Sequence, residues 1–151
     1  MPDHLRSDPL SLDALLEETS GVDAGALVVF GGVVRAQDHG REVAALDYDA
    51  HMAMAEDVMA RIEGELLERE GVLACRLLHR TGEVPAGDAS VYAVVRARHR
   101  PEAFQAARDA IDRLKAEVPI WKEDISPDGS RTPRSAGEGT PLRPQRENPS
   151  P

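Results

Sequence analysis

Residues 90–125, SVYAVVRARHRPEAFQAARDAIDRLKAEVPIWKEDI, contain the alternation of elements that decides the fold. Residues 90–98 are rich in valine and apolar on both faces, which predicts a central strand. Pro101 then begins a helix whose apolar stripe steps by three and four residues, at Phe104, Ala107, Ile111, Leu114 and Val118. Pro119 ends this helix, because proline lacks an amide donor and clashes with the preceding turn. Residues 120–125 then predict a short strand.

Similar patterns extend toward the N-terminus. Residues 26–35 form a β-branched and aromatic run that predicts a strand, and Gly31 and Gly32 within it indicate a bulge or a close backbone approach. Because the connections are short enough for antiparallel pairing, we predict an α+β fold: a single domain whose mostly antiparallel mixed sheet is packed by two main helices. The other predicted elements are a short helix capped by Asp8 and ending near Gly21, a strand over 43–50, a helix over 52–69 closed by Gly71, and a strand over 72–78.

The composition is that of one acidic globular domain. The chain has 151 residues and a net charge of −9, from 18 basic and 27 acidic side chains. Nucleic-acid-binding proteins normally present a basic surface, so this balance argues against general nucleic-acid binding. A single cysteine, Cys75, excludes an internal disulfide and a multi-cysteine metal site. No apolar run resembles a signal peptide or a membrane span, so we expect a cytoplasmic protein that does not enter membranes.

The composition changes after Ile125. Six of the eleven prolines lie at residue 127 or later, and no apolar periodicity remains there. We therefore predict a domain over residues 1–126, followed by a Pro/Gly-rich tail over 127–151 that is largely disordered.

Basic residues in an acidic chain mark candidate sites for anions. His99 and Arg100 stand where the predicted central strand passes into the following helix. A helix N-terminus offers free amides and a partial positive charge, and a guanidinium can bind phosphate or carboxylate through two hydrogen bonds. An ordinary solvated helix cap explains the same residues, so both interpretations stand. Arg35 and the pair His79-Arg80 are further basic groups at strand ends.

The lysines Lys115 and Lys122 are the other basic candidates. They are seven residues apart, with Pro119 between them, so the chain must turn between the two. A lysine against apolar surface can have a lowered pKa and act as a base or nucleophile. Two surface lysines whose stems cover apolar side chains are the alternative.

Other catalytic patterns do not occur in the sequence. The five histidines lack the three- or four-residue helical spacing of zinc ligands. Cys75 lies inside a predicted strand, where a buried structural thiol is the simplest interpretation. No phosphate-binding loop or dinucleotide fingerprint is present. The residues alone thus predict a small α+β domain with a candidate anion pocket, and they name no substrate.

Several short segments, taken together, resemble the MoaE family, the large catalytic subunits of molybdopterin synthase. The resemblance extends from about Pro9 to Asp124, and its strength lies in the shared order and spacing of the segments. These segments are Gly25-Ala26-Leu27-Val28-Val29-Phe30 with Gly32 and Val34-Arg35; Leu46-Asp47-Tyr48-Asp49-Ala50; His79-Arg80-Thr81-Gly82 with Gly87; His99-Arg100 with Ala103-Phe104; and Asp112-Arg113-Leu114-Lys115 with Pro119-Ile120-Trp121-Lys122.

The resemblance implies a fold, a reaction and partners. The fold would be an α/β-hammerhead-like α+β domain. The reaction would be a sulfurtransferase step of molybdenum cofactor biosynthesis, which converts cyclic pyranopterin monophosphate into molybdopterin by installing the two dithiolene sulfurs. The sulfur donor would be the C-terminal Gly-Gly thiocarboxylate of a separate, small ubiquitin-like MoaD-type subunit. Two large subunits would form a central homodimer with one small subunit at each end, a heterotetramer, and this subunit would hold no metal or cofactor.

The resemblance also assigns roles to residues. Lys115 matches the lysine regarded as central to catalysis, and we expect it to assist attack of the thiocarboxylate sulfur by proton transfer or charge stabilisation. Lys122 matches the second pocket lysine, near the partner's tail. For the substrate phosphate, the matching positions are Arg35, His99 and Arg100. Arg131 is a further candidate, as a residue that crosses to a neighbouring pocket.

Some positions depart from the family pattern and leave a second function open. Ala36 follows the arginine of the first strand where the family often has asparagine, and His51 stands where an aromatic is usual. The segment after Gly129 lacks the family's tryptophan. The alternative is therefore a non-catalytic MoaE-like binding module that keeps the anion pocket or the partner surface. A third hypothesis is a phosphate-ligand domain unrelated to molybdenum cofactor, which would bind no partner with a Gly-Gly tail.

Overall fold

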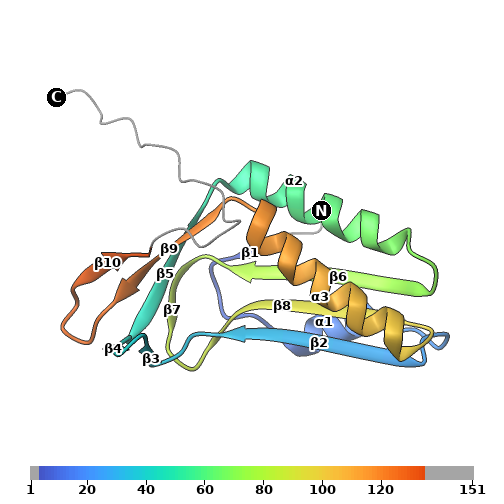
Figure 1. Ribbon diagram of the computed structural model, residues 1–151, viewed down its shortest axis with the longest axis horizontal. Helices are drawn as coiled ribbons and strands as arrows, with labels where there is room; N and C mark the ends of the chain where they lie inside the picture. Colours follow the sequence, from blue (N-terminus) through green and yellow to red (C-terminus); the bar gives the residue numbers. More distant parts are fainter. Residues whose placement is uncertain (1–3, 135–151) are drawn as a thin grey trace.

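The computed structural model describes residues 4–134 of the chain, which form two four-stranded sheets and a separate two-stranded sheet (Figure 1). Helices pack against the larger of the four-stranded sheets, the one with the longer strands. Along this range the elements are β1 (Leu5–Arg6), α1 (Leu12–Glu18), β2 (Ala26–Val33), β3 (Gln37–Asp38), β4 (Arg41–Glu42), β5 (Ala45–Ala50), α2 (Met52–Leu67), β6 (Val72–Arg80), β7 (Gly82–Pro85), β8 (Ala89–Ala97), α3 (Arg100–Glu117), β9 (Ile120–Ile125) and β10 (Arg131–Pro133).

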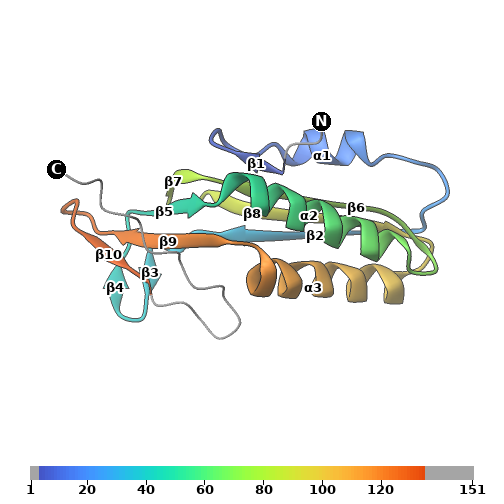
Figure 2. The ribbon, with the colours of Figure 1, turned by 90° about the horizontal axis from the view of Figure 1, so that it is seen from above.

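The larger sheet has the strand order β1-β6-β8-β2 and carries helices on both faces. Figure 2 shows α1 and α3 on opposite sides of it. Successive residues of a strand point to opposite faces. Accordingly, Leu77 of β6 packs in the main core with α2 and α3, while the next residue, Leu78, packs with Leu15 of α1. The inner position of β8 confirms that residues 90–98 contain a central strand.

Helix α3 reaches the sheet through small side chains. Its buried face is formed by Ala103, Ala106 and Ala110, together with larger apolar residues nearer its C-terminus. Alanines leave little between the helix backbone and the strands, so the helix can approach closely. Phe104 was expected in the core stripe, and this prediction is wrong: it lies one residue from Ala103, about 100° around the helix, and is 63 % exposed.

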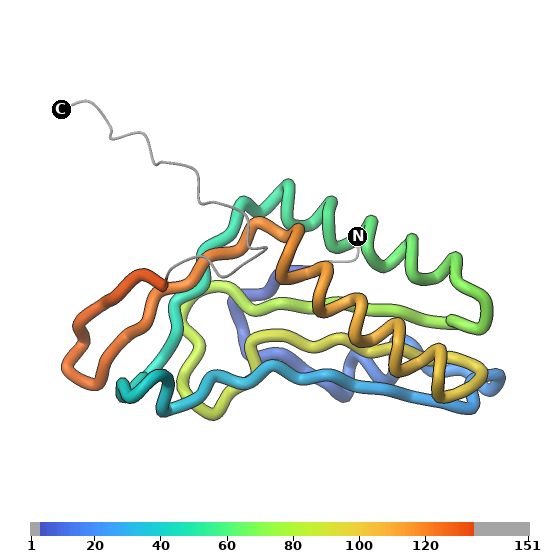
Figure 3. The backbone as a smooth tube through the Cα atoms, in the orientation of Figure 1, coloured from blue at the N-terminus to red at the C-terminus, as the bar shows by residue number. Residues whose placement is uncertain are grey.

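The second sheet has the order β10-β9-β5-β7 and a small core of its own. Leu46 and Tyr48 of β5 contribute to this core, with Val84 of β7. The backbone trace in Figure 3 shows the β9–β10 hairpin projecting from the end of the molecule where α2 begins and α3 ends. The second sheet therefore stands at the junction of the two main helices.

The paired glycines behave as the sequence predicts. The register between β2 and β8 shifts between Gly32 and Val33, which is a bulge. A Cβ on Gly32 would lie 2.6 Å from Cγ1 of Val91, and one on Gly31 would lie 3.1 Å from a ring carbon of Tyr92. Both glycines are thus sites where the neighbouring strand leaves no room for a side chain.

The α+β class is confirmed, and three details differ from the predictions. The described strands form two four-stranded sheets and the two-stranded β3-β4 sheet instead of one sheet, because β5 and β9 pair with each other away from β6 and β8. The cap of α1 is Ser11, whose hydroxyl accepts from the amide of Ala14, and not Asp8. Strand β10 pairs with β9 beyond the predicted domain boundary at residue 126, so regular structure extends to Pro133. The predicted disorder of residues 135–151 lies outside the described residues.

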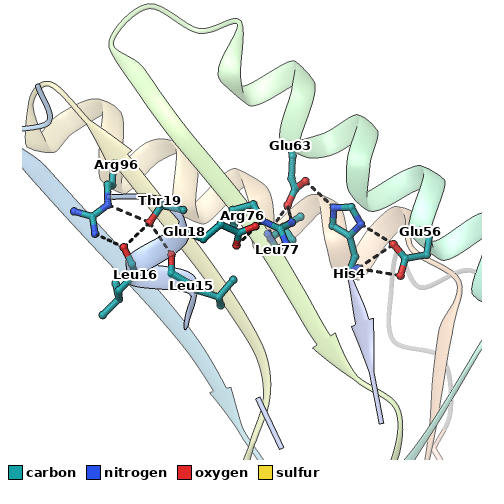
Figure 4. A network of polar contacts seen from close by, with 10 residues as sticks. All are labelled: His4, Leu15, Leu16, Glu18, Thr19, Glu56, Glu63, Arg76, Leu77 and Arg96. Carbon is teal, nitrogen blue, oxygen red and sulfur yellow. Dashed lines mark hydrogen bonds and ion pairs between the residues drawn. The ribbon is translucent and has the colours of Figure 1, made fainter. Parts of the chain in front are cut away.

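A buried ion-pair network fastens the N-terminal segment to α2 (Figure 4). The imidazole of His4 lies between two carboxylates, with Nδ1 2.6 Å from Glu56 Oε2 and Nε2 2.7 Å from Glu63 Oε1. The other Glu63 oxygen accepts from Nη1 of Arg76 and from the amide of Leu77, each at 2.7 Å. Burial lowers the pKa of His4, but the hydrogen bonds to Glu63 and Glu56 outweigh burial and raise it above its ordinary value. The network therefore favours the charged form of this buried histidine.

We expect His4→Gln to lower the free energy of unfolding by about 3 kcal/mol, because Glu63 loses a buried cationic partner. The pKa of His4 rises on folding, so its contribution is complete below its unfolded value of 6.5 and is lost as the pH rises through the folded value. Hydrogen bonds from His4 outweigh burial and lower the pKa of Glu56, so that contribution is present above 4.5 and is lost in acid. Urea unfolding should therefore give the largest difference between pH 4.5 and 6.5.

The control is His39→Gln, because the His39 side chain is 91 % exposed and its removal should change stability by less than about 0.5 kcal/mol. A loss for His4→Gln that does not vary with pH would contradict the charged state assigned to this histidine.

Candidate lysine pocket

The turn after α3 brings Lys115 and Lys122 to one place. Helix α3 ends at Glu117, Val118 is extended, and β9 begins at Ile120. These two lysines are the only ones in the chain, since the other 16 of its 18 basic residues are arginines. Both are exposed to solvent. Within residues 4–134 neither ammonium has an ion pair or a side-chain hydrogen bond, so both are available to an anionic ligand.

The position of this turn is set by contacts on both sides. The carbonyl of Pro119 accepts from the amide of His51, at 3.1 Å, which ties the turn to the start of α2. Val118 is buried in the main core, and Ile120 packs against both cores. On β9, Lys122 pairs with Tyr48 of β5. The two lysines therefore lie on packed elements, Lys115 on α3 and Lys122 on β9, and not on an exposed loop.

Lys122 has a perturbed amine. Desolvation by the surrounding protein, and then the positive charges of Arg134 and Lys115, lower the pKa of this amine below its ordinary value of 10.5. Asp38 and Asp124 act in the opposite direction but do not cancel the effect. A lowered pKa makes proton release easier, which suits a group that transfers protons or binds an anionic intermediate.

Arg35 joins the pocket through Asp38. Its backbone neighbour Val34 is held between β7 and β8, donating to the carbonyl of Asp88 and accepting from the amide of Gly87. The guanidinium of Arg35 donates to Asp38 Oδ1 at 2.9 Å, while its side chain remains 73 % exposed. The guanidinium of Arg35 is thus oriented by Asp38, and most of the side chain is exposed to solvent. Both properties suit a residue that binds an anion.

His79 is a buried histidine close enough to Lys122 to be affected by its charge. Its ring meets that of Tyr48 edge to face, with 4.9 Å between centroids, and its Nδ1 bonds the carbonyl of Arg80 at 2.7 Å. Burial, opposed by that hydrogen bond and assisted by the charge of Lys122, lowers the pKa of His79 to about 4. His79 is therefore neutral at physiological pH. Arg80 is buried and paired with Asp88, so this basic pair is structural.

His99 and Arg100 lie at the opposite end of α3 from Lys115. Fifteen helical residues at a rise of about 1.5 Å separate Arg100 from Lys115 by about 22 Å. His99 precedes the helix without a side-chain capping bond, is exposed, and lies 3.7 Å from Glu102. Within one chain, the structure does not bring these two residues to the lysines.

Arg131 is engaged on the other face of the second sheet. Asp47 pairs with Glu123 and Glu83, whereas Lys122 pairs with Tyr48, so the two sets of side chains point to opposite faces. The Arg131 guanidinium bonds Asp47 at 2.6 Å and Glu83 at 2.8 Å. It ties β10 to β5 and β7, and does not join the lysine pocket.

The residue in reach of the lysines is Arg134, which sequence reasoning missed. Its amide donates to the carbonyl of Lys122 at 3.2 Å, and its guanidinium bonds Asp38 and Asp124. Residue 134 fell in the predicted tail, so it was not considered, and Asp38 fell in a predicted polar loop. Successive residues of a strand point to opposite faces of the sheet. Once β10 is known to pair with β9, this rule places Arg131 and Arg134 on opposite faces.

Cys75 and the rest of the described chain add no second chemistry. Burial raises the pKa of the Cys75 thiol to about 12, so it is protonated and structural, as expected. Residues 4–134 contain no group of three side chains suited to hold a metal ion. None of the helices in this range is long and apolar enough to cross a membrane.

Comparison with known proteins identifies a family and similar folds. Residues 5–117 match the family model described as MoaE protein. The chain is 40 % identical over 126 residues to the molybdopterin synthase catalytic subunit 1 of Mycobacterium tuberculosis, covering 83 % of this chain and 86 % of the relative.

Two solved structures are similar in fold. Molybdopterin synthase from Staphylococcus aureus superposes with a TM-score of 0.79 and 35 % identity, covering 85 % of this chain and 94 % of that one. A complex of subunits 1 and 2 of molybdopterin-converting factor from Helicobacter pylori superposes with a TM-score of 0.71 and 27 % identity, covering 87 % and 85 %. The family match over most of the folded part, together with this identity, shows that the chain belongs to the MoaE protein family.

Proposed function

We propose that the chain is the catalytic subunit of a molybdopterin synthase, a sulfurtransferase that acts on cyclic pyranopterin monophosphate. The observation that carries the proposal is the pair of lysines on either side of the turn after α3, the only two in the chain. The charge of Lys115 acts on the Lys122 amine, and neither lysine has an ion pair among the described residues. Relatives of the chain carry the name molybdopterin synthase catalytic subunit, which agrees with the proposal.

The charges of the pocket fit the substrates of this reaction. A thiocarboxylate tail and a cyclic phosphate are both anions, and two free ammonium groups with Arg35 attract them to one place. The thiocarboxylate sulfur forms a bond to a carbon of the pterin side chain while a carbon–oxygen bond at that carbon breaks, and the departing oxygen takes up a proton. Water then cleaves the acyl–sulfur bond, which leaves the sulfur on the pterin and a carboxylate on the carrier. Lys115 stabilises the charge that develops in these steps or moves the proton, and Lys122 orients the anionic tail.

The carrier and a second copy of the chain complete this proposal. The sulfur donor is a small MoaD-type subunit with a C-terminal Gly-Gly thiocarboxylate. The similar structure from Helicobacter pylori is a complex of subunits 1 and 2 of molybdopterin-converting factor, which supports a two-subunit assembly. His99 and Arg100 reach a lysine pocket only from another chain, which supports a homodimer inside a heterotetramer. Strand β2 is a sheet edge, and exposed apolar side chains on it and on α3 offer such an interface: Leu27, Val29, Phe30, Val33 and Phe104. The proposal includes action in the cytoplasm.

A non-catalytic binding module is the second candidate, motivated by Ala36 and the altered C-terminal segment. The lowered pKa of the Lys122 amine favours the enzyme, because a module that only binds has no need of an amine that releases its proton more readily. Formation of the dithiolene product distinguishes the catalytic subunit from the binding module.

We expect Lys115→Ala to lower the rate of dithiolene formation by about 100-fold or more, the usual effect of removing a charge-stabilising or proton-transferring group. The assay combines the purified chain, a thiocarboxylated small subunit and cyclic pyranopterin monophosphate. The control is Arg108→Gln, an exposed cation on the same helix. Partner binding without product from the unaltered chain would support the binding module, and an active Lys115→Ala would refute the assigned role.

The Lys122 amine should titrate below 10.5 in the free protein. Two lysines in the chain give two side-chain signals in ¹³C-lysine NMR, and Lys115→Arg identifies them. Because the positive charge of Lys115 contributes to the lowered pKa of Lys122, Lys115→Ala should raise that pKa. An unchanged titration in the alanine variant would show that the two amines do not interact.

Mixing two inactive variants tests whether a second chain completes the pocket. If Lys115 and Arg100 act in one site from different chains, an equal mixture of Lys115→Ala and Arg100→Ala forms dimers with one intact site. Random exchange then restores about a quarter of the unaltered activity. A mixture that stays inactive although exchange is demonstrated would show that both residues serve the site from the same chain or that Arg100 acts elsewhere.

A further inference from the structure

The guanidinium of Arg134 lies between two buried carboxylates beside the lysine pocket. Its Nη2 contacts Asp38, and its Nε lies 2.6 Å from Asp124 Oδ1. The side chains of Asp38 and Asp124 are only 4 % and 10 % exposed, and that of Arg134 is 25 % exposed. Partly buried ion pairs with short hydrogen bonds hold a definite geometry, unlike pairs on an open surface.

Asp38 transmits this constraint to Arg35. One oxygen of its carboxylate contacts Arg134 and the other accepts from Arg35 at 2.9 Å. We propose that Arg134 is a positioning residue of the pocket, which fixes Asp38 so that Asp38 in turn directs Arg35 toward the anionic substrate. The role of Arg35 as a substrate residue rests on the proposed function, whereas the fixing of Asp38 does not.

The same ion pairs give the two carboxylates near Lys122 a cationic partner. The charged groups that affect Lys122 are Lys115 at the end of α3, Arg134 after β10, Asp38 on β3 and Asp124 on β9, and the buried His79 of β6 is neutral. With Arg134 present, both carboxylates contact its guanidinium. Without it, Asp38 would keep only its bond from Arg35 and Asp124 would lose the guanidinium, so both carboxylates would act more strongly on the lysines and compete with an anionic substrate.

Removal of Arg134 therefore has two consequences. The Lys122 amine loses a nearby positive charge, and the two carboxylates near it are no longer neutralised by Arg134, so the pKa of the amine rises. Arg35 loses its fixed direction, so the KM for the pterin substrate rises by about tenfold while kcat changes less.

The experiment compares Arg134→Gln and Arg134→Lys with the unaltered chain. The glutamine removes the charge, and the lysine keeps it without the two-sided geometry of the guanidinium. The matched control is Arg69→Gln, which breaks an equally short ion pair, 2.6 Å, between the turn after α2 and Asp109 of α3. Thermal unfolding of each variant establishes that the compared proteins are folded.

The first readout needs no activity: ¹³C-lysine NMR should show a higher pKa for Lys122 in Arg134→Gln, a value closer to the original in Arg134→Lys, and no change in Arg69→Gln. The second readout is KM. Asp38→Asn should raise KM as Arg134→Gln does, and the double variant should be no worse than either, because both residues act through one contact.

An unchanged Lys122 titration in Arg134→Gln, or effects of Arg134→Gln and Asp38→Asn on KM that simply add, would overturn the proposal. Equal losses of kcat and thermal stability with KM unchanged would also overturn it, since they indicate a structural role only. If the chain makes no product at all, the proposed function fails, and the NMR titration still decides whether Arg134 sets the state of the pocket.

Discussion

The pocket depends on the turn by which the chain leaves α3. Helix α3 ends at Glu117, because Pro119 favours an extended conformation of the preceding residue, Val118. The carbonyl of Pro119 accepts from the amide of His51 at 3.1 Å. That hydrogen bond joins the end of α3 to the start of α2, where β5 also ends. Lys115 and Lys122 therefore meet at a junction of packed elements. A shift of β9 by one residue against β5 would turn Lys122 to the face that holds Arg131.

Arginine and lysine have different roles in this chain. Arginines make most of its structural ion pairs, among them Arg76 with Glu63 and Arg131 with Asp47. A guanidinium is always charged and can bind carboxylates from two sides, which suits cross-links between elements. An ammonium is a compact charge whose pKa responds to its surroundings, and the chain has just two, both at the pocket. A protein with a net charge of −9 thus presents a local cationic site to an anion.

The length of α3 keeps His99 and Arg100 away from the lysines within one chain. The helix separates Arg100 from Lys115 by most of its length, and the two ends cannot approach each other, since a helix is stiff. The buried network around His4 has the opposite character, because all its groups satisfy one another inside a single chain. Basic side chains without an ion pair are therefore the candidates for ligand binding, whereas the fully paired groups around His4 support the fold.

The sequence by itself determined the features that depend on near neighbours. Residue periodicity specified α2, α3 and the central β8, Pro119 specified the end of α3, and the bulge at Gly32 followed from the paired glycines. The resemblance led to the family and to both lysines.

Only the tertiary structure decided which arginine enters the pocket. Asp38 and Arg134 are 134 − 38 = 96 residues apart, and their contact exists because β10 pairs with β9 in one particular register. That register points Arg134 toward Lys122 and Arg131 away from it, a choice that composition and spacing within a proline-rich segment do not contain. The acidic partners of the two arginines come from strands far away in the sequence, Asp38 of β3 for Arg134 and Asp47 of β5 for Arg131, so the physical cause of the choice lies outside the local sequence.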